Sequence, residues 1–88
     1  MAKRDQILDS VLRGTSDANI AFSDLCALLA RLGFSERVRG DHHIFTRDGV
    51  EEILNLQPKQ AKAKPYQMKQ IRVVIHRYRL AGDDDDNE

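Results

Sequence analysis

The dipeptide Asp48-Gly49 separates two runs of strand-forming residues and constrains the fold more than any other local signal. Residues 42–47 and residues 50–56 are both rich in β-branched, aromatic and aliphatic side chains. Glycine adopts the positive φ that a two-residue hairpin turn requires, so the dipeptide predicts an antiparallel β-hairpin. Residues 34–39 are a third, shorter strand candidate. Three consecutive strands are most simply arranged as a meander.

Apolar residues at helical spacing predict three helices around this meander. The clearest covers residues 23–32, with Ser23 as the N-cap and Gly33 as the C-terminal stop. A shorter helix is predicted over residues 3–13, and a third begins at Pro65, which suits a first helical turn. The stripes expected to face the core are Leu25, Leu28, Leu29 and Leu32 in the second helix, and Met68, Ile71, Ile75 and Tyr78 in the third.

Composition is typical of a small globular domain. The chain has 88 residues, enough for one hydrophobic core, and 41% of them are hydrophobic. It contains no run of about 18 apolar residues, so no transmembrane helix is predicted. The polar residues near Met1 interrupt any signal-peptide apolar region, and a cytoplasmic location is the expectation. The only cysteine, Cys26, excludes an internal disulfide and a multi-cysteine zinc site.

The formal net charge of zero conceals a strong asymmetry. Residues 83–88 carry five of the 14 acidic side chains, whereas residues 55–82 contain no Asp or Glu. The basic segment predicts a polyanionic partner, and the acidic tail is either a solubilising extension or a competitor for the basic surface. Plain solvation of loop and helix is the alternative interpretation of the basic residues. The candidate phosphate-binding residues are Lys59, Lys62 and Lys64 in a predicted loop and Lys69, Arg72 and Arg79 on the last helix.

Two adjacent histidines, His42 and His43, begin the first strand of the hairpin. Side chains alternate along a strand, so if Phe45 packs inward, His43 is drawn toward the core and His42 points to solvent. Imidazole exchanges protons near neutral pH, and an exposed histidine beside a phosphate-attracting surface suits general-base cleavage of RNA. We favour His42 as the base, with His43 as its competitor. Because the two point in opposite directions they cannot jointly chelate a metal, and no metal or cofactor is predicted.

The segment Arg31-Leu32-Gly33-Phe34, followed by Arg39-Gly40-Asp41-His42-His43-Ile44-Phe45, a hairpin, a proline-containing loop and a helix, resembles the HicA (YcfA-like) family of bacterial toxins. The resemblance covers roughly residues 22–79. The family signature is a Gly-Ser-His segment, often with a second histidine and then an aromatic residue. This chain matches it except at Asp41, where serine is usual. The family's active-site histidine maps onto His42, or onto His43 as in relatives that keep only the second histidine.

The resemblance implies an α+β, double-stranded-RNA-binding-like fold, with a three-stranded antiparallel sheet packed on helices. We therefore divide the chain into an extra N-terminal helix and linker (1–21), a HicA-like domain (22–80) and a disordered acidic tail (81–88). The family's activity would be metal-independent endonucleolytic cleavage of mRNA, with Gly40 and the six basic residues named above contacting RNA. A HicB-like antitoxin protein would be the partner.

Two other functions are compatible with the residues. The first is a non-catalytic RNA-binding module of the same fold, with Asp41 as a sign of lost activity. The second is a winged-helix DNA binder that uses the Asp48-Gly49 hairpin as its wing. Against DNA binding, Arg31 is the only basic residue in the helix before the strands.

Overall fold

Three helices and three strands make up the part of the chain that the structure describes. The structure is a computed structural model and describes residues 6–14 and 19–81. The first part of the predicted 3–13 helix, most of the linker and all but residue 81 of the predicted acidic tail lie outside the described residues. In chain order the elements are α1 (Gln6–Arg13), α2 (Phe22–Arg31), β1 (Ser35–Arg39), β2 (His42–Arg47), β3 (Val50–Leu56) and α3 (Pro65–Tyr78).

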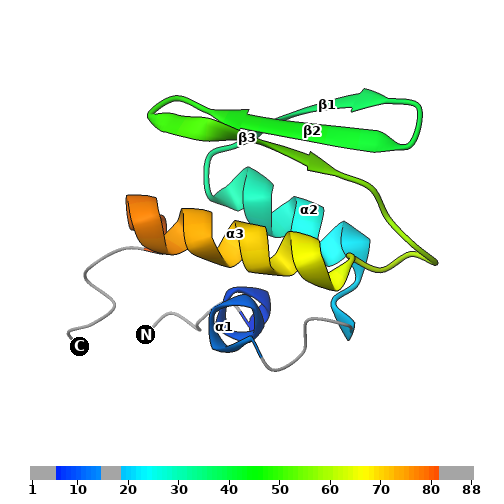
Figure 1. Cartoon of the computed structure of the whole chain (residues 1–88), viewed down its shortest axis with the longest axis horizontal. Coiled ribbons are helices and arrows are strands. Elements are labelled where there is room, and N and C mark those ends of the chain that lie inside the picture. The colour runs from blue at the N-terminus through cyan, green and yellow to red at the C-terminus, as the bar shows by residue number, and fades with distance from the viewer. Residues whose placement is uncertain (1–5, 15–18, 82–88) are drawn as a thin grey trace.

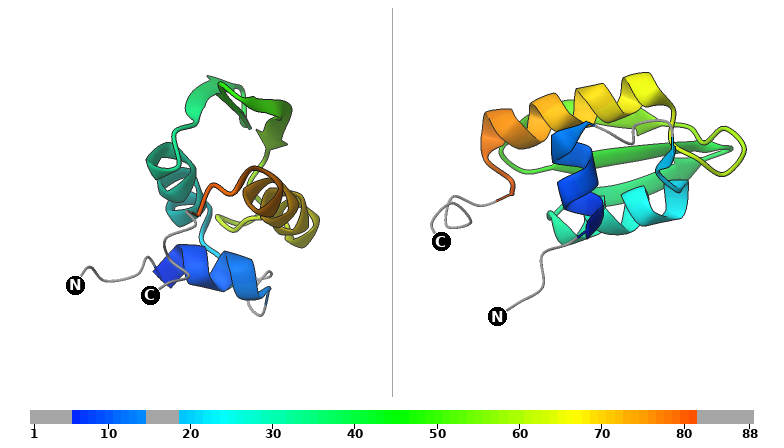
Figure 2. Two further views of the ribbon diagram at one scale, coloured as in Figure 1. Left: turned by 90° about the vertical axis from the view of Figure 1, so that its left-hand side faces the viewer. Right: turned by 90° about the horizontal axis from the view of Figure 1, so that it is seen from below.

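The sheet and the helices form stacked layers. Both strand pairs are antiparallel, in the order β1-β2-β3. Figure 1 shows α2 and α3 side by side beneath the sheet, and α1 on the far side of that helix pair. The two views of Figure 2 agree, and α1 lies across the pair. The predicted α+β, double-stranded-RNA-binding-like fold with a three-stranded sheet is therefore confirmed. We call the sheet face toward the helices the inner face and the opposite one the outer face.

The core lies between the inner face and the two helices. Phe45 on β2 and Leu54 and Leu56 on β3 are fully buried there. α1 adds Leu8 and Val11 to the same cluster. The helix residues that meet these side chains are Leu25, Leu28 and Leu29 of α2 and Met68, Ile71, Val74 and Ile75 of α3. These positions confirm the predicted stripes. Val74 is an additional core residue that the stripes did not include.

The beginning of α2 differs from the prediction. The helix starts at Phe22, its N-cap is Ala21, and no side chain caps it, so the predicted cap at Ser23 is wrong. A neighbouring loop supplies the missing partner, because the Phe22 N–H donates to the Ala61 carbonyl at 2.9 Å. The N–H groups at the start of a helix have no partner within the helix, and here a backbone carbonyl of another segment supplies one. The start of α2 is therefore set by the loop before α3.

The same loop brings several distant segments together at one end of the molecule. The Ala63 N–H donates to the Ile20 carbonyl at 3.0 Å, and Ala21 forms a bridge with Lys62. The turn between β1 and β2 lies at this end of the sheet layer, and the first turn of α3 lies at the same end of the helix layer (Figure 1). Residues that are more than 20 positions apart in sequence thus share one region, which we call the loop end.

Candidate active site

His42 projects from the outer face at the loop end. It is the first residue of β2 and lies directly opposite Arg39 of β1. Gly40 opens the turn between them with a φ of 63°, which a residue with a side chain adopts only at a cost. A Cβ at Gly40 would meet nothing within 4 Å, so the backbone conformation, not space, is the reason for glycine there. The side chain of His42 is 49% exposed, which leaves it accessible to a large substrate.

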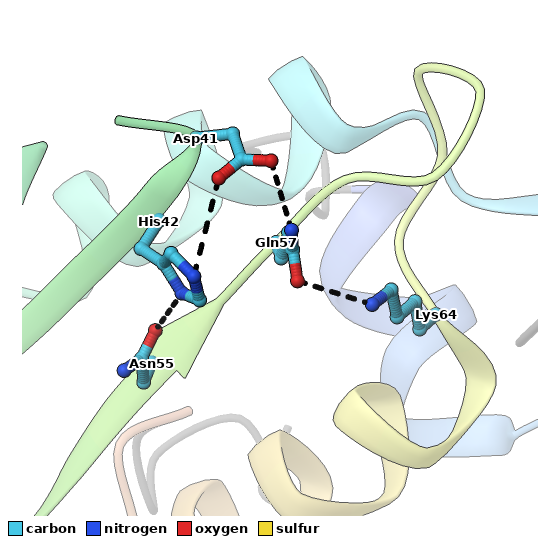
Figure 3. A network of polar contacts seen from close by, with 5 residues as sticks. All are labelled: Asp41, His42, Asn55, Gln57 and Lys64. Atoms are coloured by element: carbon cyan, nitrogen blue, oxygen red, sulfur yellow. Dashed lines mark hydrogen bonds and ion pairs between the residues drawn. The ribbon is translucent and has the colours of Figure 1, made fainter. Parts of the chain in front are cut away.

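A chain of polar contacts joins His42 to the loop before α3 (Figure 3). The His42 Nδ1 lies 3.0 Å from Asn55 Oδ1 on the neighbouring strand, and His42 Nε2 lies 3.9 Å from Asp41 Oδ1. The Gln57 side-chain amide donates to Asp41 Oδ2 at 2.8 Å, and Lys64 Nζ donates to Gln57 Oε1 at 3.3 Å. The network therefore connects the imidazole to a cation through two intervening side chains, Asp41 and Gln57.

Asp41 is held in its ionised form. The hydrogen bond from Gln57 lowers the pKa of Asp41, as do its backbone hydrogen bond and the charges of His42 and Lys64. Hydrogen bonds and positive charges that stabilise a carboxylate always act in this direction. The imidazole thus faces a negative charge on one side, while Asn55 holds its other nitrogen.

His43 lies on the inner face, with surroundings unlike those of His42. Its Nδ1 is 2.6 Å from Glu36 Oε2, and its ring meets Phe22 edge-on with the centroids 4.8 Å apart. The side chain is 24% exposed. Cys26 of α2 is close by, and burial together with the charge of Glu36 raises the pKa of its thiol to about 11. The predicted division of the two histidines between opposite faces agrees with this geometry.

The predicted phosphate-binding residues fall into two groups. Lys59, Lys62 and Lys64 lie in the loop between β3 and α3, and Lys64 reaches Asp41, the neighbour of His42, through Gln57. Lys69 is exposed about one turn further along α3.

Arg72 and Arg79 lie elsewhere. The Arg72 Nε donates to the Val11 carbonyl at 2.7 Å, so this half-buried side chain connects α3 to α1. Arg79 follows the last residue of α3 in a left-handed conformation with a φ of 54°, at the opposite end of that helix from Lys64. The structure therefore does not gather these two arginines with the histidines.

Sequence reasoning missed several residues beside His42. Arg37 and Arg39 share the outer face with it, because their partners across β2 are Ile44 and His42. A groove on this face is lined by residues of all three strands, among them both arginines and the exposed Ile53. Strand alternation from His42 together with the hairpin register predicts this placement, but both arginines precede the acid-free segment 55–82, in which the six candidate cations lie.

The loop end also carries an exposed aromatic ring. Tyr66 in the first turn of α3 is 64% exposed, and Lys64 Nζ lies 6.0 Å from its ring centroid. A second groove runs between the loop and this turn, lined by Gln57, Pro58, Lys59, Lys64, Pro65 and Tyr66. An exposed ring beside lysines suits the stacking of an unpaired base next to its phosphate.

A comparison with protein-family models matches residues 22–82 to the family described as HicA toxin of bacterial toxin-antitoxin. The match begins at the first residue of α2 and includes all three strands and α3. The chain belongs to the HicA toxin family. Neither the comparison with curated proteins nor that with solved structures found a match. As a HicA family member the protein has the role of a toxin, and a toxin of such a pair has a cognate antitoxin.

The HicA match leaves α1 outside its limits, although α1 packs on the helices of the matched segment. Within the described residues, no helix is both long and apolar enough to cross a membrane.

Proposed function

We propose that this HicA toxin is a metal-independent endoribonuclease that cleaves mRNA with His42 as its general base. The observation that carries the proposal is the orientation of the His42 ring. Asn55 Oδ1 is a hydrogen-bond acceptor, so the Nδ1 that faces it at 3.0 Å carries the proton. The lone pair of the neutral imidazole is then on Nε2, on the exposed outer face, where it is available to a substrate.

The reaction that suits such a base is an internal transesterification of RNA. His42 Nε2 accepts the proton of a ribose 2′-hydroxyl, the 2′-oxygen forms a bond to the adjacent phosphorus, and the bond from phosphorus to the 5′-oxygen breaks. The departing 5′-oxygen takes a proton from water. The products are a 2′,3′-cyclic phosphate and a 5′-hydroxyl, and neither a metal nor a cofactor takes part.

Cations near His42 support this chemistry. Arg39 lies directly across the strand pair, and Lys64 reaches the same region through Gln57. Cations placed where charge develops on phosphoryl oxygens stabilise the transition state. Asp41, 3.9 Å from Nε2, stabilises the imidazolium that forms after proton transfer. Its charge also repels the substrate phosphate, so Asp41 has two opposing effects.

Recognition of mRNA would depend on phosphate contacts and on unpaired bases. Arg37, Arg39, Lys59 and Lys64 provide positive charge, and Tyr66 provides one exposed stacking surface. Single-stranded RNA is recognised by this combination of charge and stacking, with little sequence preference. A HicB-like antitoxin would neutralise the toxin most directly by covering His42 and the outer face.

The test is cleavage of a single-stranded RNA by purified protein in the presence of EDTA. We expect His42→Ala to reduce the cleavage rate by about 10²–10⁴-fold, the usual contribution of a general base. His76→Ala is the matched control, because His76 is an exposed histidine on α3. The wild type should yield fragments ending in a 2′,3′-cyclic phosphate, and its induction should arrest growth.

A folded His43→Ala variant distinguishes the two histidines. We expect it to retain most of its cleavage rate per folded molecule, because the His43 side chain contacts Glu36 and Phe22 on the inner face. Full activity of His42→Ala together with an inactive, folded His43→Ala would assign the base to His43 instead.

The second candidate function is RNA binding without cleavage. The ionised Asp41 beside the histidine favours it, because a negative charge at that position opposes the approach of phosphate. Wild-type protein that binds RNA and leaves it intact, with or without divalent metals, would establish this function. DNA binding is not proposed, because among the exposed residues of α2 only Arg31 is basic.

A further inference from the structure

Three side chains with different metal-binding atoms converge beneath β2. Cys26 from α2, Glu36 from β1 and His43 from β2 each offer one ligand atom, and these atoms all lie within 4.8 Å of one another. They come from three separate elements and do not belong to the contacts around His42. His42 and His43 cannot chelate an ion as a pair, but His43 alone can contribute a ligand to this set.

The arrangement follows from strand register. Glu36 pairs with Phe45, and Val38 pairs with His43, so Glu36 and His43 lie diagonally on the inner face. Such diagonal neighbours are close enough for long side chains to touch. α2 packs under this corner of the sheet and brings Cys26 to the pair. Phe22, one turn before Cys26 on α2, holds the His43 ring by its edge.

The distances are close to those of a tetrahedral site. Zinc lies about 2.3 Å from a thiolate and about 2.0–2.2 Å from imidazole and carboxylate, so its ligand atoms are roughly 3.3–3.8 Å apart. The present separations of up to 4.8 Å, together with the 2.6 Å between Glu36 and His43, need side-chain shifts of about an ångström or less. None of the three residues is fully buried, because Cys26 and His43 are half-buried and Glu36 is exposed. Solvent can therefore reach the site.

We infer that Cys26, Glu36 and His43 bind a Zn²⁺ ion, with water as the fourth ligand. Thiolate, imidazole and carboxylate are the donor set that zinc prefers, and soft sulfur disfavours magnesium and calcium. The ion displaces the thiol proton of Cys26, and its charge offsets the two negative ligands. It replaces the hydrogen bond between Glu36 and His43 with bonds that join α2 to both strands.

The site lies on the inner face, directly behind the strand that presents His42 on the outer face. Its role is therefore structural: zinc would stabilise the start of β2. This inference does not rest on the proposed ribonuclease activity, because metal binding is measured without RNA. Zinc binding and cleavage can each fail independently of the other.

The first experiment titrates the reduced, full-length, metal-free protein with Co²⁺ as a spectroscopic probe for zinc. We expect one equivalent to give a thiolate-to-cobalt charge-transfer band and the visible bands of tetrahedral cobalt. Zn²⁺ should abolish both by displacing cobalt. Because Cys26 is the only cysteine, the charge-transfer band reports this site and no other. Oxygen-only binding by the aspartates at positions 83–86 gives no such band, and finding only that would overturn the inference.

Thermal unfolding provides an independent measurement. A ligand that binds only the folded state raises the melting temperature, so Zn²⁺ should stabilise the wild type by several degrees. Cys26→Ser, Glu36→Gln and His43→Ala should each lose most of this increase, whereas His42→Ala and His76→Ala should keep it. Loss of the increase in His42→Ala, with His43→Ala unaffected, would place the metal on the outer face and refute the site.

Alkylation of Cys26 tests the site in the wild-type protein, so this measurement does not depend on how well the variants fold. Bound Zn²⁺ should protect Cys26 from alkylation in the native protein, and removal of zinc by a chelator should restore alkylation. An alkylation rate that zinc does not change would contradict the inference, whatever the stability of the variants.

Discussion

Asp41 is the residue at which this chain departs from the family signature. It occupies the turn that begins with Gly40, and Gln57 and Lys64 compensate for its charge. An acidic residue in this position would be costly beside a phosphate, but the contacts hold it ionised and close to the His42 ring. The Asp41 carboxylate therefore interacts with side chains far from it in sequence, and a scan for the Gly-Ser-His motif could not reveal them.

The first prediction concerns Asp41→Ser, made in a His42→Ala background so that binding is measured without cleavage. We expect RNA affinity to increase several-fold at low salt, because a negative charge near the phosphates is removed. The increase should shrink as salt screens the interaction. Fluorescence anisotropy with a single-stranded RNA measures both effects.

Asp48→Ser is the control for Asp41→Ser. Asp48 is an exposed aspartate in the hairpin turn at the other end of the sheet, so its replacement changes the net charge equally. Equal gains in affinity from the two variants would mean that Asp41 acts only through net charge.

A small polar cluster outside the core joins β3 to α3. The Tyr78 hydroxyl donates to Glu52 Oε1 at 2.8 Å, and the Arg77 guanidinium pairs with the other carboxylate oxygen. The hydrogen bond from Tyr78 is the main cause that lowers the pKa of Glu52, and Arg77 contributes to it. Tyr78 packs against the core, as its place in the predicted apolar stripe requires, and its hydroxyl also ties the helix to the sheet.

This cluster predicts a pH-dependent stability. Because the pKa of Glu52 is lower in the folded protein than in the unfolded chain, the carboxylate stabilises the fold above the unfolded pKa. This contribution is lost as the pH falls through the folded pKa. Urea unfolding should show that Glu52→Gln is less stable than wild type near neutral pH. The difference should shrink steadily between about pH 5 and about pH 3.

Glu51→Gln serves as the control for Glu52→Gln. It removes the same charge from the adjacent residue, which is exposed and points to the outer face. If both variants lost the same stability with the same pH dependence, contact with α3 would not be the cause.

α1 lies outside the segment that matches the family and packs on it. It buries Leu8 and Val11 against the helix pair, and Arg72 donates to the Val11 carbonyl across that interface. Arg72 was predicted to contact RNA, yet its guanidinium is directed toward α1. A basic residue at the right helical spacing can thus serve packing, and its sequence position does not distinguish the two uses.

Arg72→Met should therefore lower the free energy of unfolding by about 1–3 kcal/mol, since it removes a hydrogen bond and leaves a buried carbonyl without this donor. Met keeps the bulk of the aliphatic stem. Lys69→Met is the control, because Lys69 is exposed on the same helix and carries the same charge.

Two measurements test the role of Arg72. Chemical unfolding gives the loss of stability, and amide hydrogen exchange should show faster exchange in α1 of Arg72→Met than in the control. Equal stability of Arg72→Met and Lys69→Met would mean that the contact with Val11 does not hold α1.

Local sequence patterns are sufficient to predict the helices and strands and their order. The residue ranges predicted for β2 and β3 agree with the structure, and α3 begins at Pro65 as expected, because turn glycines, proline and apolar periodicity act over a few neighbouring residues. Alternation also placed the two histidines on opposite faces of the sheet. These features follow from local backbone geometry, which short stretches of sequence carry.

The contacts between distant residues, in contrast, follow from the packing of the elements. The loop before α3 sets the start of α2, Gln57 bridges Asp41 and Lys64, and Arg72 turns to α1. Strand register and helix docking likewise bring Cys26 to Glu36 and His43. These contacts depend on how whole elements pack around one core, and packing is a property of all the side chains together, not of any one segment.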